Sequence, residues 1–551
     1  MPALEPEDIA VRLSRTRTWG GLETDNHYGP AHPDSTYAEE LGEPGEFPFT
    51  RGAYPRMYRS RMWTQRTIVG YGGPEDTREG VDAAIAAGNA GFDVVSDVPT
   101  GQAFDPDHPV MGPDVGLEGC SLPTVNDLDL LTAGIDLTET DVAWHTVMMT
   151  YPMVIALARR RGYDIGKLQG SNMPDHLTHA IIGWGHGVIP PELGHRYHTD
   201  QLAYVARHTP KWAAGFPQGY EIREMGISPA GEIAVGMAIV NQTLTDLAAR
   251  GVTADEVAPS LAWISTSGID FFEEVAKFRA LRRIWARTLR DRHGATNERA
   301  MRLRISCHSS GRTMTYQQPL NNIVRGSTEM LAALCGGVQS MEVCAYDEAI
   351  GIPTEQAREV AIRTQQIVAH EVGGARVADP LGGSWYVEAL TDQVEAEALR
   401  LLAKIEEIGI VKAVTDNVIE QWCEDTEMDM MREMEDGERI VVGVNRFVKD
   451  TEPDPQRFTV ERWRIERHLK RFAETKAARD PHLLQRRMDD VYTAVRNGNQ
   501  WHDALVEAFL ADATIGEAWG TVRVAAGYPY DAFKALESPF GHHACGTAVT
   551  S

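Results

Sequence analysis

Apolar positions along most of the chain repeat with two different periods. Between residues 271 and 289 they recur at steps of three and four, which predicts a helix with one buried face. Short apolar runs, which are typical of buried strands, lie at 92–99, 261–266, 303–308, 338–345 and 439–445. Strands that alternate with helices predict a parallel sheet, so we expect an α/β fold. A (β/α)8 TIM barrel suits this length, and a doubly wound open sheet is the alternative.

The two ends of the chain have a different composition from this middle part. Residues 1–50 are rich in Pro, Gly, Asp and Glu and show little periodicity, which predicts an extended N-terminal arm. A Pro-containing stretch at 449–458 indicates a linker, and charged helical segments follow it. We therefore expect an arm over 1–50, a substrate-binding barrel over 51–449, and a helical C-terminal region over 450–551 that acts as a linker or contacts another subunit.

Charge and cysteine usage restrict the partners and the compartment. The 551 residues include 53 basic and 79 acidic side chains, so the formal net charge is −26. This charge argues against nucleic acid or an anionic membrane as the main partner. The start of the chain lacks the pattern of a secretory signal, and the 6 cysteines are scattered without a CxxC pair. We expect a cytoplasmic protein.

Local motifs alone do not identify a chemistry. The sequence lacks GxxxxGK[ST], GxSxG and HExxH. Histidines are concentrated between 176 and 198, at His176, His179, His186, His195 and His198. Two pairs with three-residue spacing would suit a metal site on helices. Because no ligand signature is complete, we favour surface and loop histidines near a pocket and assign no metal site.

Ordered sequence blocks carry a much more specific signal. The stretch RGAYPRMYRSRMWTQRTIVG begins at residue 51, and later blocks include DVPTGQAFDPDHP (97–109), FFEEVAKFRALRRIWA (271–286), DPLGGSWYVEALT (379–391) and VVGVNRF (441–447). The blocks resemble those of the adenosylcobalamin-dependent acyl-CoA mutases, the methylmalonyl-CoA mutase family, and follow the same order. The size and the ending of the chain resemble the large subunit of two-subunit members such as 2-hydroxyisobutyryl-CoA mutase.

The resemblance implies a barrel that is threaded by its substrate, in which adenosylcobalamin starts a radical rearrangement of an acyl-CoA carbon skeleton. Such an enzyme is an isomerase. In this family a flavodoxin-like domain carries DxHxxG, whose histidine binds cobalt. The stretches DRHGAT (291–296) and DPHLLQ (480–485) lack the final glycine. We therefore expect a separate small cobalamin-binding subunit, in a heterotetramer of two large and two small chains.

Site residues carry over from the family position by position. Matches to positions that hold the CoA tail are Tyr54, Arg61, Thr64 and Arg66. Two guanidinium groups there would suit phosphates, and a surface ion-pair cluster is the alternative. Matches to positions that contact the corrin or the adenosyl group are Ser96, Val98, Gly119, Glu224, Cys344 and Glu348. Glu348 would bind the ribose hydroxyls, with a helix N-terminal acid as the alternative. Gln339 and Tyr220 match substrate-pocket positions, and Tyr220 is assigned a catalytic role together with Glu221.

Two departures from the family affect the acyl group. Ile68 stands where methylmalonyl-CoA mutases have a tyrosine, and Gly183 or Trp184 stands where they have an arginine that pairs with the substrate carboxylate. A buried carboxylate without these partners would be costly. We therefore expect a branched acyl-CoA substrate, with or without a hydroxyl group, rather than methylmalonyl-CoA.

Further departures concern the thioester. Glu221 replaces the family's histidine that donates to the thioester carbonyl, and Met173 and His308 replace two glutamines. A carboxylate at 221 would repel a carbonyl oxygen, so it must be protonated, bridge through water, or face a donor on the substrate. Other changed positions are Asp93, Ala143, Ala262 and Cys344. So many changes leave a second hypothesis open: a barrel of mutase ancestry that lacks catalysis and serves as a binding or assembly subunit.

Overall fold

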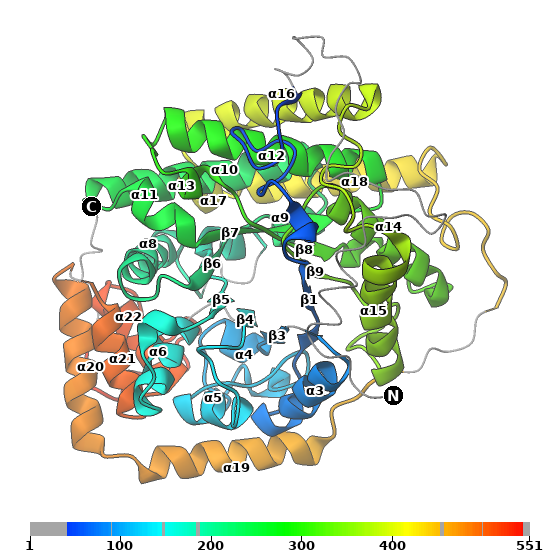
Figure 1. Cartoon of the computed structure of the whole chain (residues 1–551). Coiled ribbons are helices and arrows are strands. Elements are labelled where there is room, and N and C mark those ends of the chain that lie inside the picture. The colour runs from blue at the N-terminus through cyan, green and yellow to red at the C-terminus, as the bar shows by residue number, and fades with distance from the viewer. Residues whose placement is uncertain are drawn as a thin grey trace. The chain divides into compact units, whose positions relative to one another are not determined.

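The computed structural model describes residues 41–89, 91–145, 149–182, 188–451, 457–498 and 500–543. Its strands are all parallel and follow the order β1-β9-β8-β7-β6-β5-β4-β3-β2. From β2 onward, helices lie between successive strands of the chain (Figure 1). Uniformly parallel strands that alternate with helices are the architecture of an α/β barrel. The predicted fold class is therefore confirmed. Most of the predicted N-terminal arm lies outside the described residues.

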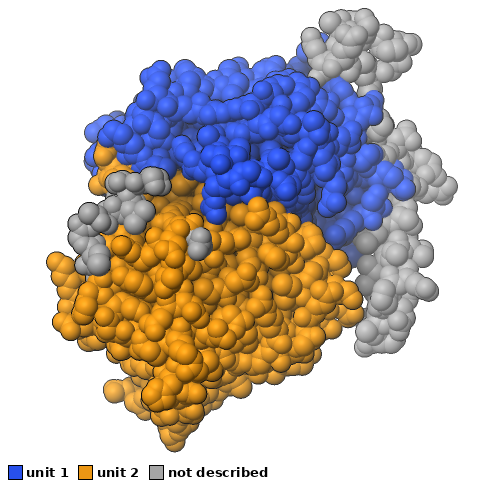
Figure 2. Space-filling view, turned by 90° about the vertical axis from the view of Figure 1, so that its left-hand side faces the viewer, with its two compact units in different colours: residues 1–66, 217–413, 418–458 blue, residues 67–216, 414–417, 459–551 orange. Residues whose placement is uncertain are grey.

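The chain divides into two compact units (Figure 2). Unit 1 comprises residues 1–66, 217–413 and 418–458. Unit 2 comprises residues 67–216, 414–417 and 459–551. The expected domain boundaries remain predictions.

Unit 1 contains four strands of the sheet and the long helices beside them. The strands are β1 (Thr64–Arg66), β7 (Leu261–Ser267), β8 (Ile305–Ser309) and β9 (Ser340–Glu342). Their register pairs Trp263 with Ile305, Ser306 with Ser340, and Thr64 with Ser340. Nearly every residue of β7 is buried, as expected for a parallel strand with both faces covered. The helices include α10 (Pro229–Ala249), α12 (Phe271–Asp291), α14 (Asn322–Cys335), α16 (Trp385–Ile408) and α18 (Val418–Glu435).

Helix α12 matches the helix that apolar periodicity predicts. It begins after Asp270, whose side chain accepts a hydrogen bond from the backbone N–H of Glu273, a typical N-cap. Phe278, Leu281 and Leu289 lie on its buried face. The opposite side carries arginines that pair with acids on α16, so the two helices are fixed by both packing and charge.

One predicted strand is wrong. Residues 439–445 form a turn and an isolated bridge between Val442 and Arg446 instead of a strand in the sheet. The side chain of Asn445 binds the backbone N–H of Val441 at 2.8 Å and the carbonyl of Arg439 at 2.7 Å. These local bonds satisfy the backbone groups that a sheet would otherwise need.

Unit 2 contains the other strands: β2 (Ile68–Val69), β3 (Phe92–Val95), β4 (Val142–His145), β5 (Gly170–Asn172) and most of β6 (Trp212–Gln218). Phe92 pairs with Val142, and Gly170 pairs with Trp212. Its helices before the C-terminal region include α3 (Pro74–Ala86), α5 (Val125–Leu131), α6 (Thr150–Arg160), α7 (His176–Ile181) and α8 (Pro191–His208).

The C-terminal region of unit 2 is helical, with α19 (Arg462–Ala478), α20 (Pro481–Arg496), α21 (His502–Leu510) and α22 (Ile515–Ala525). Helix α19, orange in Figure 1, lies beside α3 and α5. Arg464 pairs with Asp76 at 2.5 Å, and Arg471 pairs with Asp127 at 3.1 Å. Its basic face thus covers an acidic face of the same unit. Among the described helices, none is both long enough and apolar enough to cross a membrane.

Candidate active site

The carboxyl ends of the unit 1 strands gather most of the predicted cofactor and catalytic residues. His308 lies near the end of β8, and Cys344 and Glu348 follow β9. The short helix α9 (Gly219–Glu224), which follows β6, carries Tyr220, Glu221 and Glu224. Parallel strands end at one edge of a sheet, so residues far apart in the sequence meet there.

Glu224 and Glu348 lie on either side of Gly311. A β-carbon at Gly311 would be 3.6 Å from Oε2 of Glu224 and 3.6 Å from Cγ of Glu348. Glu224 is held firmly, because it accepts hydrogen bonds from the Thr266 hydroxyl at 3.0 Å and from the backbone N–H of Arg312 at 2.7 Å. Gly311 therefore leaves a space beside two carboxylates that any other residue would fill.

Three titratable groups at this edge, Tyr220, Cys344 and Glu348, have raised pKa values. Burial, together with the charges of Glu342, Asp347 and Glu224, raises the pKa of Glu348 to about 8. Because Glu348 is exposed, the neighbouring negative charges contribute more to this raised pKa than burial does. Burial and Glu224 raise the pKa of Tyr220 well above its usual value. Burial and Glu342 do the same for Cys344.

His308 is paired with an acid that the sequence analysis did not identify. Its Nδ1 lies 3.4 Å from Oε2 of Glu342, and its ring packs against Tyr220 with ring centroids 4.8 Å apart. Both members of the pair are buried. Glu342 is the last residue of β9 and lies within the predicted strand 338–345, where an acid among buried residues was the available signal. The carboxylate lies near enough to Nδ1 to interact electrostatically with a protonated imidazole.

A buried ionic network lies behind α9. Lys277 is 2.9 Å from Glu232 and 2.7 Å from Glu274, and Arg223 is 3.2 Å from Glu274. Burial alone would lower the pKa of Lys277, but Glu232 and Glu274 raise it above its usual value. Lys277 also donates to the backbone oxygen of Thr266, the residue that binds Glu224. The network thereby supports the position of the site.

The predicted CoA-binding residues of unit 1 lie in and just before β1, with Thr64 at the amino end of this strand and Arg66 at its carboxyl end. Tyr54 and Arg61 are exposed, and Thr64 begins β1. Arg302 approaches the Tyr54 ring, with its guanidinium carbon 5.4 Å from the centroid. Arg66 is buried and donates to the hydroxyl of Ser340 at 2.8 Å. Exposed Arg61 and buried Arg66 thus differ in environment.

Gln339 uses its amide on the backbone. Its side-chain oxygen accepts from the N–H of Ile305 at 2.9 Å, and its nitrogen donates to the carbonyl of Gly337 at 2.8 Å. Its own backbone oxygen accepts from Thr64 at 3.0 Å. These bonds tie the amino ends of three strands together, a structural task that the sequence does not reveal.

In unit 2 the residues Ser96, Val98 and Gly119 come together. Ser96 and Cys120 form an isolated bridge, and a β-carbon at Gly119 would lie 2.2 Å from the backbone oxygen of Ser96. Only glycine permits this approach. Val98 begins the short helix α4 (Val98–Gly101), which is capped by the side chain of Asp97.

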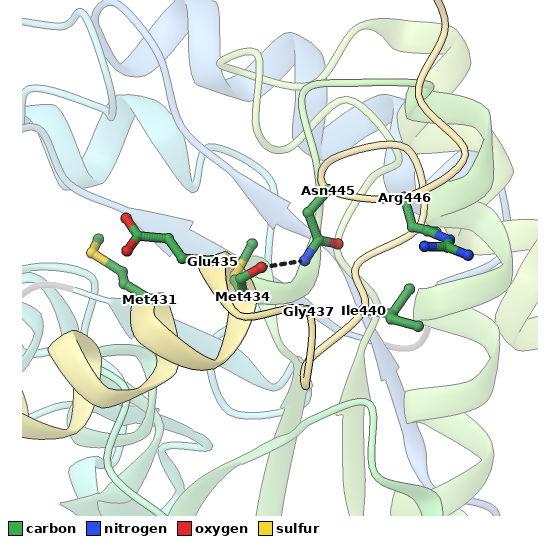
Figure 3. A pocket seen from close by; sticks show the side chains of 7 residues that line it. All are labelled: Met431, Met434, Glu435, Gly437, Ile440, Asn445 and Arg446. Carbon is green, nitrogen blue, oxygen red and sulfur yellow. Dashed lines mark hydrogen bonds between the residues drawn. The ribbon is translucent and has the colours of Figure 1, made fainter.

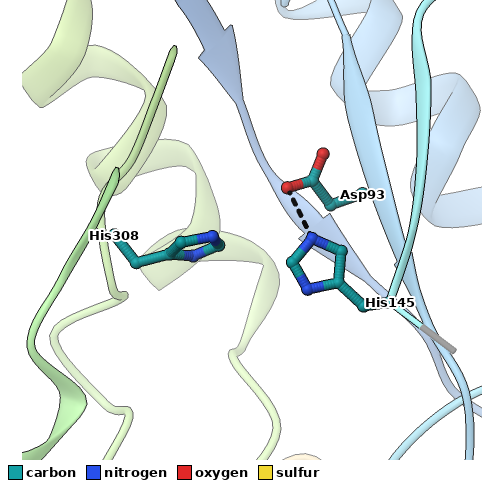
Figure 4. A group of neighbouring side chains, drawn as sticks. All are labelled: Asp93, His145 and His308. Atoms are coloured by element: carbon teal, nitrogen blue, oxygen red, sulfur yellow. Dashed lines mark hydrogen bonds and ion pairs between the residues drawn. The ribbon is translucent and has the colours of Figure 1, made fainter. Parts of the chain in front are cut away.

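A second histidine–acid pair lies on the unit 2 strands. Nε2 of His145, at the end of β4, is 3.1 Å from Oδ2 of Asp93 on β3 (Figure 4). Ile68 pairs in register with Asp93, and Ala143 is the partner of Asp93 on β4. His145 was missed, although a histidine at the end of the run VAWH was visible.

Four further predicted residues lie elsewhere or are not described. Met173 is buried and follows β5, and Ala262 lies on β7 of unit 1. Gly183 and Trp184 lie outside the described residues.

The expectation of surface histidines is wrong for four of the five. His176, His179, His195 and His198, on α7 and α8, are buried, and His186 lies outside the described residues. Burial lowers the pKa of His179 to about 4 and that of His198 to about 3. Burial also lowers the pKa of His176 well below its usual value. The imidazoles of His176, His179 and His198 are therefore neutral at pH 7, and they lie where α7 and α8 pack together.

Comparisons with known proteins agree with the sequence blocks. The family described as methylmalonyl-CoA mutase matches residues 17–528. The chain is 37% identical over 525 residues to the 2-hydroxyisobutanoyl-CoA mutase large subunit of Aquincola tertiaricarbonis, which covers 93% of both chains. It is 33% identical over 520 residues to the mitochondrial methylmalonyl-CoA mutase of Homo sapiens, which covers 93% of this chain and 67% of the human protein. A methylmalonyl-CoA mutase of Rhizobium meliloti is 31% identical over 490 residues.

Proposed function

Since the chain belongs to the methylmalonyl-CoA mutase family of isomerases, we propose that it is the large subunit of an adenosylcobalamin-dependent acyl-CoA mutase. It rearranges the carbon skeleton of a branched acyl-CoA, with or without a hydroxyl group. The observation that carries this proposal is that Tyr220 and Cys344 interact with Glu224 and Glu348, the two acids beside Gly311, at the carboxyl ends of the unit 1 strands.

The residues of this edge suit the proposed cofactor. An accessible carboxyl group at Glu348, beside a glycine without a side chain, offers oxygen atoms that can accept hydrogen bonds from ribose hydroxyls. When bound, adenosylcobalamin supplies the organic radical that starts the rearrangement. The protein's part is to position Glu224 and Glu348, to keep Tyr220 protonated, and to exclude water and other hydrogen donors from the reaction.

The carboxyl groups at this edge of unit 1 affect which acyl group can bind there. Glu221, Glu224, Glu342 and Glu348 all contribute carboxyl groups to one edge of unit 1. The free carboxylate of methylmalonyl-CoA would be repelled by any ionised carboxylates there. A substrate hydroxyl could donate to Glu221 or to His308, which lies beside Glu342. This reasoning favours a neutral, hydroxylated branched acyl group.

The partner is a separate small subunit that carries the cobalt ligand. The Aquincola relative is named a large subunit, and this chain lacks a complete DxHxxG. We propose a heterotetramer of two large and two small chains in the cytoplasm. The five described cysteines are free thiols, as suits a reducing compartment.

Incubating the chain with its small subunit, adenosylcobalamin and a panel of acyl-CoAs tests this proposal. We expect isomerisation, followed by mass spectrometry, of a branched hydroxyacyl-CoA and little or none of methylmalonyl-CoA. Glu348→Gln should raise the concentration of adenosylcobalamin needed for half-maximal activity at least tenfold, because one acceptor of the ribose is weakened. The matched Glu466→Gln on exposed α19 should have no effect. Absence of turnover with every acyl-CoA, despite formation of the complex, would favour the non-catalytic binding or assembly subunit.

A further inference from the structure

Residues 428–448 of unit 1, hereafter the 428–448 surface, expose several large apolar side chains to solvent. Met431 is 47% exposed, Ile440 56% and Phe447 70%. Met428, Val442 and Val448 are exposed as well. Met431, Met434, Gly437, Ile440 and Asn445 are among the residues that line a cavity of about 510 Å³ (Figure 3). Several exposed apolar side chains within about twenty residues, some of them beside a cavity, are typical of an interaction site.

The 428–448 surface is held in shape by hydrogen bonds. Besides its bonds to Val441 and Arg439, Asn445 donates to the carbonyl of Met434 at 2.9 Å, which fixes the turn to the end of α18 (Figure 3). Arg325 donates to the carbonyl of Val442 at 2.8 Å, and Gln318 donates to that of Phe447 at 3.0 Å. The exposed side chains are therefore presented by a fixed backbone, which lowers the entropic cost of binding.

A direct chain of contacts joins this surface to the candidate active site. Arg312 binds Glu224 through its backbone N–H and donates from its side chain to the Glu224 carbonyl at 3.2 Å. The same guanidinium pairs with Glu427 and contacts the sulfur of Met430 at 3.5 Å. The 428–448 surface thus adjoins the edge of unit 1 that carries Glu224 and Glu348. Any polypeptide that delivers a cofactor to these residues must approach this edge.

We propose that the 428–448 surface is the docking site for the small cobalamin-carrying subunit, an inference that rests on the proposed function. The partner would insert an apolar side chain into the cavity and surround it with basic residues. Acidic side chains outnumber basic ones along 424–438, and Glu435 lines the cavity together with Arg446, so basic groups on the partner would face a mainly acidic segment. A second copy of this acidic segment would be repelled by the same charges.

The test uses the full chain and, as probe, a DxHxxG protein encoded beside it, loaded with adenosylcobalamin. The double variant Met431→Ser/Phe447→Ser should raise the Kd of the complex about tenfold or more, measured by titration calorimetry. Its melting temperature should equal that of the parent chain, because both side chains are exposed. The matched control Leu399→Ser/Ile408→Ser removes two exposed aliphatic side chains from α16 and should leave the Kd unchanged. Glu435→Lys should slow association and reduce its salt dependence.

Each outcome has a defined meaning. A double variant that binds the small subunit as tightly as the parent overturns the docking proposal. If the parent chain does not bind the small subunit but forms a homodimer that the double variant abolishes, the docking proposal is wrong and the surface binds a second copy of this chain. If the complex forms and the variant weakens it, but no acyl-CoA is isomerised, the docking proposal stands and the proposed activity fails.

Discussion

Replacing Lys277 by methionine would test the ionic network that supports the site. The ammonium group lies within 3 Å of two carboxylates, on Glu232 and Glu274, and all three side chains are fully buried. Methionine fills a similar volume but leaves both acids without their main counter-ion. Removing one partner of a buried ion pair costs about 3–5 kcal/mol. Glu274 would keep Arg223 at 3.2 Å, whereas Glu232 would lose its cation, so we expect a loss within this range.

The loss should appear in denaturation of the whole chain. At about 2–4 °C per kcal/mol for a unit of a few hundred residues, the melting temperature should fall by roughly 6–20 °C. Lys470→Met is the matched control, because Lys470 is exposed and lies 3.9 Å from Glu474, and it should change nothing measurable. Adding Glu232→Gln and Glu274→Gln to Lys277→Met should recover part of the loss, since neutral amides need no counter-ion. A single variant within about 1 kcal/mol of the parent would refute the reasoning.

Three further predictions concern other parts of the site. Gly119→Ala should cost about 1–3 kcal/mol in urea denaturation, because its β-carbon would collide with the Ser96 backbone; unchanged stability would mean that this backbone yields freely. His179 and His198, with pKa values lowered by burial to about 4 and about 3, take up protons only in the unfolded chain below about pH 6.5. Stability should therefore fall as the pH drops, by about 2 kcal/mol per histidine at pH 5, and a flat profile from thermal melts between pH 7.5 and 5 would contradict this. Glu221→Gln should lower kcat/KM for a hydroxyacyl-CoA about 10- to 100-fold if the charged acceptor binds the hydroxyl, whereas unaltered kinetics would make Glu221 a bystander.

Parts of the fold follow from local sequence signals, as α12 shows. Its apolar steps of three and four and the capping residue Asp270 act within the helix itself. The run at 439–445 has an equally apolar pattern, yet it forms a turn, because Asn445 bonds to its own neighbours. Apolar runs specify burial or contact without specifying the hydrogen-bond partner, which depends on side chains several residues away.

The candidate site divides in the same way. Family blocks place Glu224 and Glu348 in the sequence, but only the fold brings both beside Gly311. Glu342 was missed because its role depends on the distant residue His308, and pairs between separate strands leave no periodic signal. The side-chain amide of Gln339, a predicted pocket residue, makes hydrogen bonds to backbone groups instead. These bonds depend on the register of neighbouring strands.

The most direct test of the account is to follow the absorbance of adenosylcobalamin in the assembled pair of large and small subunits. We predict that a branched hydroxyacyl-CoA will cause a rapid loss of the adenosylcobalamin spectrum, that methylmalonyl-CoA will cause much less, and that either subunit alone will give no change. A cofactor spectrum that stays constant with every branched acyl-CoA, in a complex shown to contain both subunits, would contradict the proposed activity.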